Sequence, residues 1–231
     1  TPDTGTGLNL FSDGNVAVAG STNGIPPDGL KRALQAGWTI HRMNDGGIWY
    51  LNFNHRTGRI TSNRNFRKAL QHVVDNNTLV NRALKVPGYT PSPSLFPSWI
   101  RGVDGLFRQE YPPPEITIDV AKAKEYLELA RRELGLDTWP PIPLLTQDTE
   151  VALKSAEYFQ GLFKQTLGLE ILVDPQIFKQ RLAKVEAGDF EMAIYGWGPD
   201  YDDPMTFGDL FASWNPNNAG KYNNPEYDRW V

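Results

Sequence analysis

The second half of the chain alternates strand-like apolar runs with amphipathic helical segments, and this alternation constrains the fold more than any other feature. The pattern predicts strands at 142–146, 169–173 and 190–197, and helices at 149–167 and 178–187. Both helices end at a glycine, Gly168 or Gly188, as helices commonly do. Strand–helix–strand units at this spacing favour parallel connections. We therefore predict an α/β fold with a mixed, mostly parallel sheet and helices on both of its faces.

The first fifty residues give weaker signals. A helix is predicted to begin near Pro26 and Pro27 and to end at Gly37. Two β-rich runs, 39–43 and 48–54, lie on either side of an Asp-Gly-Gly turn. This arrangement predicts a β-hairpin between the two runs.

Helical signals return in the middle of the chain. Apolar residues three to four apart predict a helix over 63–73, and Asp75 stands where the N-cap of a following helix would be. Residues 86–118 are rich in proline and predict a long ordered loop. Asp119 is then expected to cap a helix that ends at Gly135.

Composition excludes several classes of protein. The 231 residues include 23 Lys and Arg against 27 Asp and Glu, and this mildly acidic balance argues against nucleic-acid binding. The chain has no cysteine, which rules out disulfides, cysteine-ligated metals and a cysteine nucleophile. No apolar stretch approaches the length of about 18 residues that a membrane-spanning helix needs. The first residues lack the pattern of a signal peptide and the last ones read as an unfinished helix, so we expect a piece of a longer chain.

The sequence also lacks familiar catalytic motifs. The three histidines, at positions 41, 55 and 72, have no metal-ligand spacing. There is no phosphate-binding loop, no dinucleotide fingerprint and no nucleophile elbow. We therefore assign no catalytic residue, no metal ligand and no cofactor.

One cluster, GWGPDYDDP at 196–204, follows the last predicted strand. In open α/β sheets, ligands bind at the carboxyl ends of the strands, so this cluster lies where a site would be expected. Asp203 and Pro204 have the positions of an N-cap and a first helical residue for a short helix through Phe211. An acidic turn of purely structural role would also explain Asp200 and Asp202.

Asp200 has a second interpretation, as a carboxylate that faces a ligand and binds a cationic group. A charge-assisted hydrogen bond of that kind contributes about 1.5–3 kcal/mol when it is shielded from water. Trp197 would supply an apolar wall, and Gly196 and Gly198 would let another backbone approach closely. The sixth position of a calcium loop starting at Asp200 would be Met205 instead of glycine, which disfavours a calcium site.

The segment GDFEMAIYGWGPDYDDPMTFGDLF strongly resembles the family 5 extracellular solute-binding proteins of ABC importers, whose best-known members capture oligopeptides and dipeptides. WYLNFN, NFRKALQHVVDNNTLVNRAL, AEYFQGLFKQTLGLEILV and KYNNPEYDRWV resemble other family segments in the same order. The resemblance implies a periplasmic-binding-protein-like fold. It also implies that residues 1–231 form a single lobe, the second of two, without an internal boundary, and that 1–14 and 215–231 are peripheral or crossover segments.

The resemblance also implies a ligand site. Asp200 would pair with the α-amino group of a short peptide, and the backbones of Gly196 and Gly198 would pair with its main chain like an added strand. Trp197 would line a side-chain pocket, and Tyr201 belongs to the same motif. The expected partners are the peptide, the missing first lobe and an ABC transporter permease, with no nucleic acid and a monomeric receptor. The expected location is bacterial and extracellular, either lipid-anchored at the cell surface or periplasmic.

Two alternatives remain open at this stage. An oligosaccharide or another solute would suit the aromatic residues of the same fold. A hydrolase that uses Asp200 and Asp202 is the remote alternative, because no second catalytic group accompanies the pair.

Overall fold

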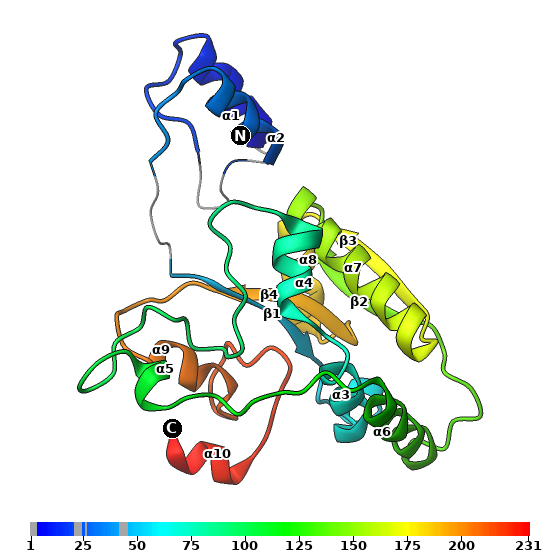
Figure 1. Ribbon diagram of the computed structural model, residues 1–231. Helices are drawn as coiled ribbons and strands as arrows, with labels where there is room; N and C mark the ends of the chain where they lie inside the picture. The colour runs from blue at the N-terminus through cyan, green and yellow to red at the C-terminus, as the bar shows by residue number, and fades with distance from the viewer. Residues whose placement is uncertain (1–3, 21–24, 26, 42–45) are drawn as a thin grey trace.

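The computed structural model describes residues 4–20, 25, 27–41 and 46–231, and its centre is a four-stranded sheet in the order β1-β4-β2-β3. Strand β4 lies antiparallel to β1 and parallel to β2, which in turn is parallel to β3. The mixed, mostly parallel sheet predicted from the sequence is therefore confirmed. Figure 1 shows these strands, whose bounds are Ile48–Phe53 for β1, Ile142–Gln147 for β2, Ile171–Gln176 for β3 and Met192–Trp197 for β4.

The predicted hairpin is wrong. Residues 39–41 form no strand, and 42–45 lie outside the described residues. Strand β1 instead pairs along its whole length with β4, so that Ile48 opposes Trp197 and Phe53 opposes Met192. Leu51 and Phe53 pack against the main core of the protein. Pairing with β4 thus places the apolar side chains of β1 against the core.

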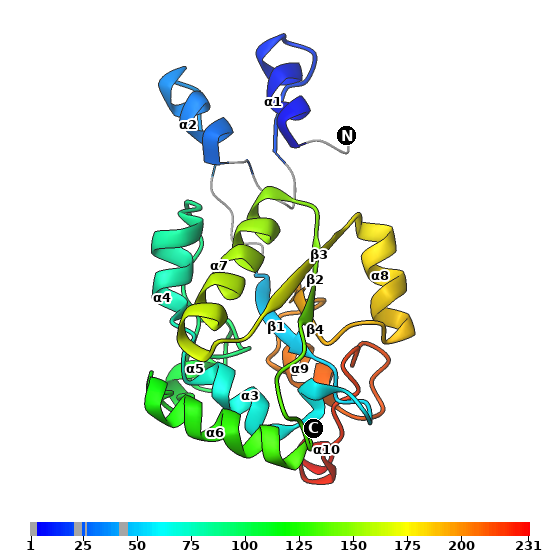
Figure 2. The ribbon, with the colours of Figure 1, turned by 90° about the vertical axis from the view of Figure 1, so that its right-hand side faces the viewer.

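Helices cover both faces of the sheet, as predicted. Helix α7 (Glu150–Leu167) and helix α8 (Phe178–Ala187) lie on opposite sides of the strands in Figure 2. The alternation of side chains along β2 explains this arrangement, because Leu144 belongs to the core cluster of α7 and Leu145 to that of α8. Both leucines are buried, so each face of the sheet needs its own helix.

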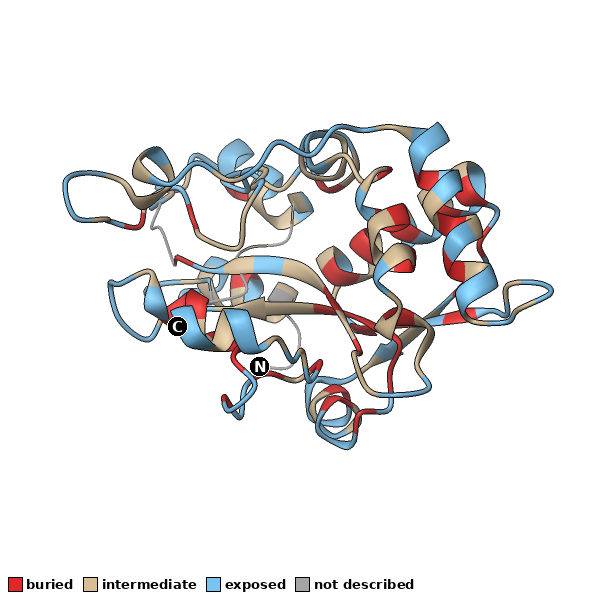
Figure 3. Cartoon of the chain, turned by 90° about the horizontal axis from the view of Figure 1, so that it is seen from below, coloured by how far each residue is buried: buried red, intermediate tan, exposed pale blue. Residues whose placement is uncertain are grey.

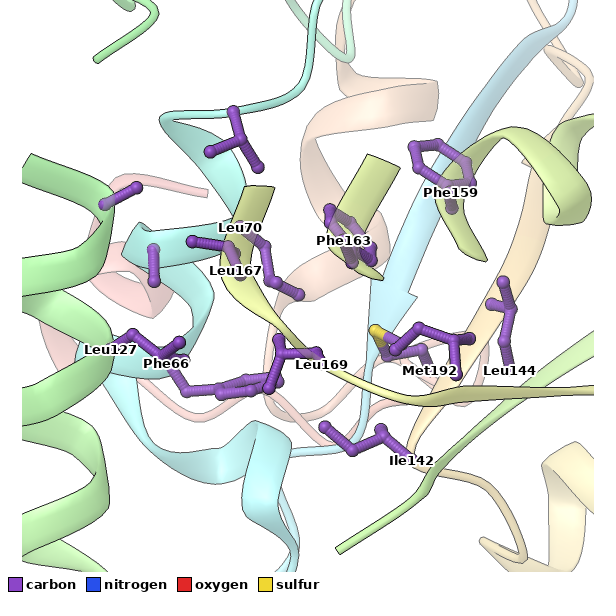
Figure 4. Packing of buried hydrophobic residues seen from close by; sticks show 14 of the residues in the cluster. Phe66, Leu70, Leu127, Ile142, Leu144, Phe159, Phe163, Leu167, Leu169 and Met192 are labelled. Atoms are coloured by element: carbon purple, nitrogen blue, oxygen red, sulfur yellow. The ribbon is translucent and has the colours of Figure 1, made fainter. Parts of the chain in front are cut away.

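The larger core lies between the sheet and helices α3 (Arg64–Gln71), α6 (Val120–Glu133) and α7. Figure 4 shows Phe66 and Phe163, both fully buried, packed among the aliphatic side chains of this cluster. Asn63 and Asp119 cap α3 and α6 by accepting backbone N–H bonds. Figure 3 shows how the buried residues concentrate on the strands and on the inward sides of these helices.

The remaining elements are short. They are α1 (Thr4–Ser12), α2 (Pro27–Gln35), η1 (Ile60–Ser62), α4 (Asn76–Thr78), the π-helical η2 (Leu79–Leu84), α5 (Phe107–Glu110), α9 (Met205–Gly208), η3 (Asp209–Phe211) and α10 (Pro225–Trp230). Asp75 caps α4 as predicted, since its side chain accepts a bond from the Asn77 N–H. The described part of the chain contains no helix with the length and apolar character that crossing a membrane requires.

Helices α1 and α2 stand apart from the sheet in Figures 1 and 2. The segments of these helices contact each other through the rings of Phe11 and Trp38, 4.9 Å apart, and through a bond from Arg32 to Asn9. Neither helix makes extensive contact with the sheet or its covering helices. The site described below therefore depends on the rest of the chain.

Candidate functional site

The carboxyl end of β4 is the centre of the candidate site. Strand β1 pairs with β4 as far as Trp197, but β2 pairs only with Met192 and Ala193. Within the described part of the chain, no strand pairs with residues 194–197 on the β2 side. The last four of the six residues of β4 thus have one backbone edge without a strand partner, at the end of the sheet where α/β proteins bind ligands.

A buried threonine fixes the chain after this strand. The Asp200 backbone N–H donates to Thr206 Oγ1 at 3.1 Å, and the Trp197 indole Nε1–H reaches the same oxygen at 3.5 Å. The Asp203 carboxylate accepts a bond from the Met205 N–H at 2.8 Å. The predicted N-cap position of Asp203 is wrong by one residue, because the helix begins at Met205 and Pro204 is its N-cap, although the Asp203 carboxylate still bonds a backbone N–H at the helix start.

The loop concentrates negative charge beside Tyr201. The side chains of Asp200, Asp202 and Asp203 are exposed. Burial and the neighbouring Asp200 carboxylate raise the pKa of Asp209. Desolvation and the carboxylates of Asp209, Asp203 and Asp200 also raise the pKa of the Tyr201 phenol. This local field favours a cationic group in front of the loop.

The two glycines of the motif have different surroundings. A Cβ atom on Gly196 would lie 2.8 Å from the ring of Trp49, its partner on β1. A Cβ atom on Gly198 would meet nothing within 4 Å. Gly196 therefore provides room for a tryptophan, whereas Gly198 leaves open space next to the backbone. Trp49 itself is 55% exposed and presents an aromatic surface at the site.

The proline-rich loop predicted at 86–118 also reaches this edge. A Cβ atom on Gly46 would lie within 3 Å of the Trp99 ring, which belongs to this loop, and also within 3 Å of the Pro199 side chain, which does not. Only a glycine therefore fits between them. The loop contains the short helix α5 and a single bridge between Arg101 and Leu106. The structure therefore places this loop against the segment that holds Asp200.

Metal binding has no support in the ranges that the structure describes, because no three His, Asp or Glu side chains gather there in a way that could hold an ion. The acidic loop instead combines exposed carboxylates with an unpaired strand edge and aromatic rings. Such a combination suits reversible binding of a solute that has both charge and hydrogen-bonding groups.

Three residues at this edge were missed by the sequence analysis. Thr206 gives no signal, because a threonine within a helix start has no distinctive pattern. Trp49 was included in a strand but not in the site, since its pairing with Gly196 depends on the long-range partner of β1. Arg181 lies in the helix before β4 and is buried, which its position in a polar helix turn does not reveal.

The fold and this edge together are those of the solute-binding class. Residues 1–219 match the family described as bacterial extracellular solute-binding proteins, family 5 Middle, and the chain belongs to that family.

The curated relatives are longer than this chain. The oligopeptide-binding protein OppA of Bacillus subtilis is 27% identical over 97% of the chain, and the match covers 41% of that protein. The dipeptide-binding protein of Lactococcus lactis is 31% identical over 72% of the chain, and the match covers 30% of that protein. The chain therefore spans less than half the length of these two relatives.

Solved structures show the same fold. Listeria monocytogenes OppA bound to peptide superposes with a TM-score of 0.82 at 28% identity, over 99% of this chain and 45% of that one. The substrate-binding domain of an oligopeptide ABC transporter from Bacillus anthracis gives a TM-score of 0.83 at 26% identity, over 99% of this chain and 44% of that one. The predicted periplasmic-binding-protein-like fold is therefore confirmed.

Proposed function

We propose that this chain is the ligand-capturing lobe of a peptide receptor that serves an ABC importer. The observation that carries this proposal is the exposed carboxylate of Asp200, which follows a strand whose backbone edge has no β2 partner over 194–197. Relatives named as oligopeptide- and dipeptide-binding proteins support a peptide as the solute. A peptide offers both a cationic amine and a main chain that can pair with a strand.

Asp200 is the proposed partner of the peptide α-amino group. Its backbone is tied to Thr206, so the carboxylate projects from a fixed loop. In the open lobe the carboxylate is exposed and well solvated, which makes a lone contact weak. When a facing surface closes over the ligand and excludes water, the same contact becomes stronger because the effective dielectric constant falls.

The backbone of β4 and of the residues after it is the proposed partner of the peptide main chain. The open space next to Gly198 permits a close approach of another backbone, and Gly196 lies on the strand segment without a β2 partner. Trp197, with Tyr201 in the same motif, would border the side-chain pockets. Main-chain bonding of this kind gives affinity that depends little on peptide sequence.

The remaining part of the receptor is proposed to supply the opposite wall of the binding site, with residues 1–231 as one lobe. The lobe has no catalytic role in this proposal. The receptor would act as a monomer outside the cell membrane, lipid-anchored or periplasmic, and deliver peptide to a permease. The family description as extracellular proteins and the ABC transporter relatives support this setting.

Calorimetry on the protein at its natural full length tests the proposal. A pool of short peptides is titrated before and after N-terminal acetylation, into the wild type and into Asp200→Asn. We expect acetylation and Asp200→Asn each to weaken binding about tenfold or more, which corresponds to about 1.4 kcal/mol. The matched control is Asp202→Asn, which removes an exposed carboxylate from the same loop and should bind like the wild type.

Each alternative gives a different result. Peptide binding that ignores acetylation would remove the amine-anchor role from Asp200. Binding of oligosaccharides in place of peptides would favour the sugar-receptor hypothesis. Turnover of a bound substrate that stops in Asp200→Asn or Asp202→Asn would establish a hydrolase.

A further inference from the structure

Met205 is an oxidisable side chain next to the loop of Asp200. The chain has no cysteine, and its three methionines are at positions 43, 192 and 205. Met43 lies outside the described residues. Met192 is fully buried on β4, whereas Met205, the first residue of α9, is 41% exposed. Of these last two, Met205 is therefore the one that an oxidant in solution can reach.

The Met205 side chain lines an open cavity of about 480 Å³. The wall of this cavity comes from the proline-rich loop, α5, α9 and α10, which lie together in Figure 1. A Cβ atom on Gly208 would lie 3.6 Å from the Met205 sulfur and 3.9 Å from the Phe96 ring, so the sulfur and this ring both flank Gly208. The other aromatic rings of the wall are those of Phe107, Tyr111, Tyr227 and Trp230. The cavity gives a molecule as small as a peroxide a path to the Met205 side chain.

Helix α9 connects this side chain to the candidate site. Its next residue, Thr206, is buried and accepts a hydrogen bond from the Asp200 N–H at 3.1 Å. The Met205 N–H donates to the Asp203 carboxylate at 2.8 Å. The oxidisable side chain thus belongs to the same helix start that holds the loop of Asp200. A displacement of this helix start would move the oxygen to which the Asp200 N–H is bonded.

Oxidation would change how Met205 packs. The thioether is apolar and polarizable, and it suits an aromatic wall. The sulfoxide is polar, and its oxygen accepts hydrogen bonds. Placing such a group against aromatic rings without a donor costs free energy, so the oxidised side chain favours contact with water over contact with the wall. The packing that holds the start of α9 is then lost, and the bond between the Asp200 N–H and Thr206 is weakened.

We propose that Met205 is a redox modification site, at which oxidation to the sulfoxide lowers the affinity of the receptor for peptide. This inference rests on the proposed peptide-receptor function and adds a regulation of the same site. The oxidant is a peroxide, which transfers one oxygen atom to the sulfur. The O–O bond breaks, an S–O bond forms, the sulfur gives up two electrons, and the peroxide is reduced to water or to an alcohol. The family is described as extracellular, and extracellular surroundings are oxidising.

Peroxide treatment of the receptor at its natural full length tests the proposal. Peptide mapping by mass spectrometry follows the gain of one oxygen atom at Met205 and at Met192. Calorimetry with a pool of short peptides measures affinity before treatment with hydrogen peroxide, after treatment, and after repair by methionine sulfoxide reductases A and B. Thermal melts check that each protein remains folded.

Three variants accompany the wild type. Met205→Leu keeps an apolar side chain of similar volume and has no sulfur to oxidise. Met205→Gln imitates the polar sulfoxide without any oxidant. Met192→Leu is the matched control, because it removes a methionine that is fully buried and leaves Met205 in place.

We expect peroxide to oxidise Met205 about tenfold faster than Met192, or faster still. Full oxidation of Met205 should weaken peptide binding about three- to tenfold, and the reductases should restore the original affinity. Met205→Leu should bind like the untreated wild type and should keep its affinity in peroxide. Met205→Gln should bind more weakly than the wild type without treatment. Met192→Leu should lose affinity in peroxide as the wild type does.

Three results overturn the inference. The first is oxidation of Met205 no faster than that of Met192. The second is unchanged affinity once Met205 is fully oxidised, and the third is a loss of affinity that persists in Met205→Leu. In each of these cases the untreated protein still binds peptide, so the peptide-receptor function stands. If the untreated protein binds no peptide, the proposed function fails and the inference fails with it.

Discussion

Replacing Thr206 with valine should weaken ligand binding without disturbing the fold. The Thr206 side chain is buried, and valine has nearly the same shape, so packing is preserved. The replacement removes the acceptor for the Asp200 N–H at 3.1 Å and for the Trp197 indole at 3.5 Å. The first bond has normal length and contributes about 1 kcal/mol, while the second is long and contributes less. We expect the unfolding free energy to fall by about 1–2 kcal/mol.

The expected effect on ligand binding follows from the loss of the hydrogen bond between the Asp200 N–H and Thr206. If the loop that holds Asp200 loses about 1 kcal/mol of support, the binding-competent loop conformation becomes rarer and peptide affinity falls about fivefold. Calorimetry and urea unfolding of Thr206→Val measure both quantities. Thr206→Ser retains the hydroxyl and should bind like the wild type. Thr166→Val is the matched control, since its hydroxyl bonds within helix α7, away from the site. Wild-type affinity in Thr206→Val would refute this reasoning.

Two further predictions concern stability. Phe163→Ala should lower the unfolding free energy by about 3–5 kcal/mol, because the ring is fully buried. The control Leu129→Ala, at a 45% exposed position, should change the unfolding free energy by less than about 1 kcal/mol. Urea unfolding measures both changes. Burial and the charge of Arg67 lower the pKa of His55 from 6.5 to about 4, so the folded protein keeps this imidazole neutral. Its stabilising contribution is present above about pH 6.5 and is lost as the pH falls towards 4. His55→Gln should therefore lose less stability than the wild type in thermal melts across that interval, and His41→Gln, at an exposed position, should follow the wild type.

Much of the second half of the fold could be predicted from local signals. Helix α8 has the predicted bounds, and Gly188 ends it in the left-handed conformation with φ of 70°. Strand β3 begins at Ile171, two residues later than predicted. Leu169 is fully buried although it precedes the strand, so the apolar pattern marks burial and not the start of strand pairing.

The partner of β1 could not be predicted in this way. A turn signal at Gly46 and Gly47 is local, whereas strand pairing depends on which apolar surface is available in the folded chain. Strand β4 lies more than 130 residues further along and offers that surface to Leu51. The antiparallel position of β1 thus follows from tertiary packing, which a turn motif does not encode.

The same limit applies to the candidate site. The sequence identifies the loop of Asp200 through its composition and position, and the structure places that carboxylate in solvent. The sequence predicts one common role for Gly196 and Gly198. In the structure their roles differ, because only Gly196 contacts the ring of Trp49. Thr206 acts through a side chain that points back at the strand end, and such a contact exists only once β4 and α9 are in place.

The charges of Asp200 and Arg181 should affect the free energy of unfolding differently, because one side chain is exposed and the other is buried. An exposed carboxylate remains hydrated without a ligand, so Asp200→Asn should leave stability nearly unchanged and affect only binding. A buried guanidinium lacks that hydration, and the Nε of Arg181 is buried without a hydrogen-bond partner. Arg181→Met should therefore melt at the same temperature as the wild type or higher, because it removes a buried unpaired charge. Thermal melts of the two proteins measure the difference, and a clearly lower melting temperature in Arg181→Met would show that the guanidinium contributes net stability through its contacts with Phe178 and Tyr195.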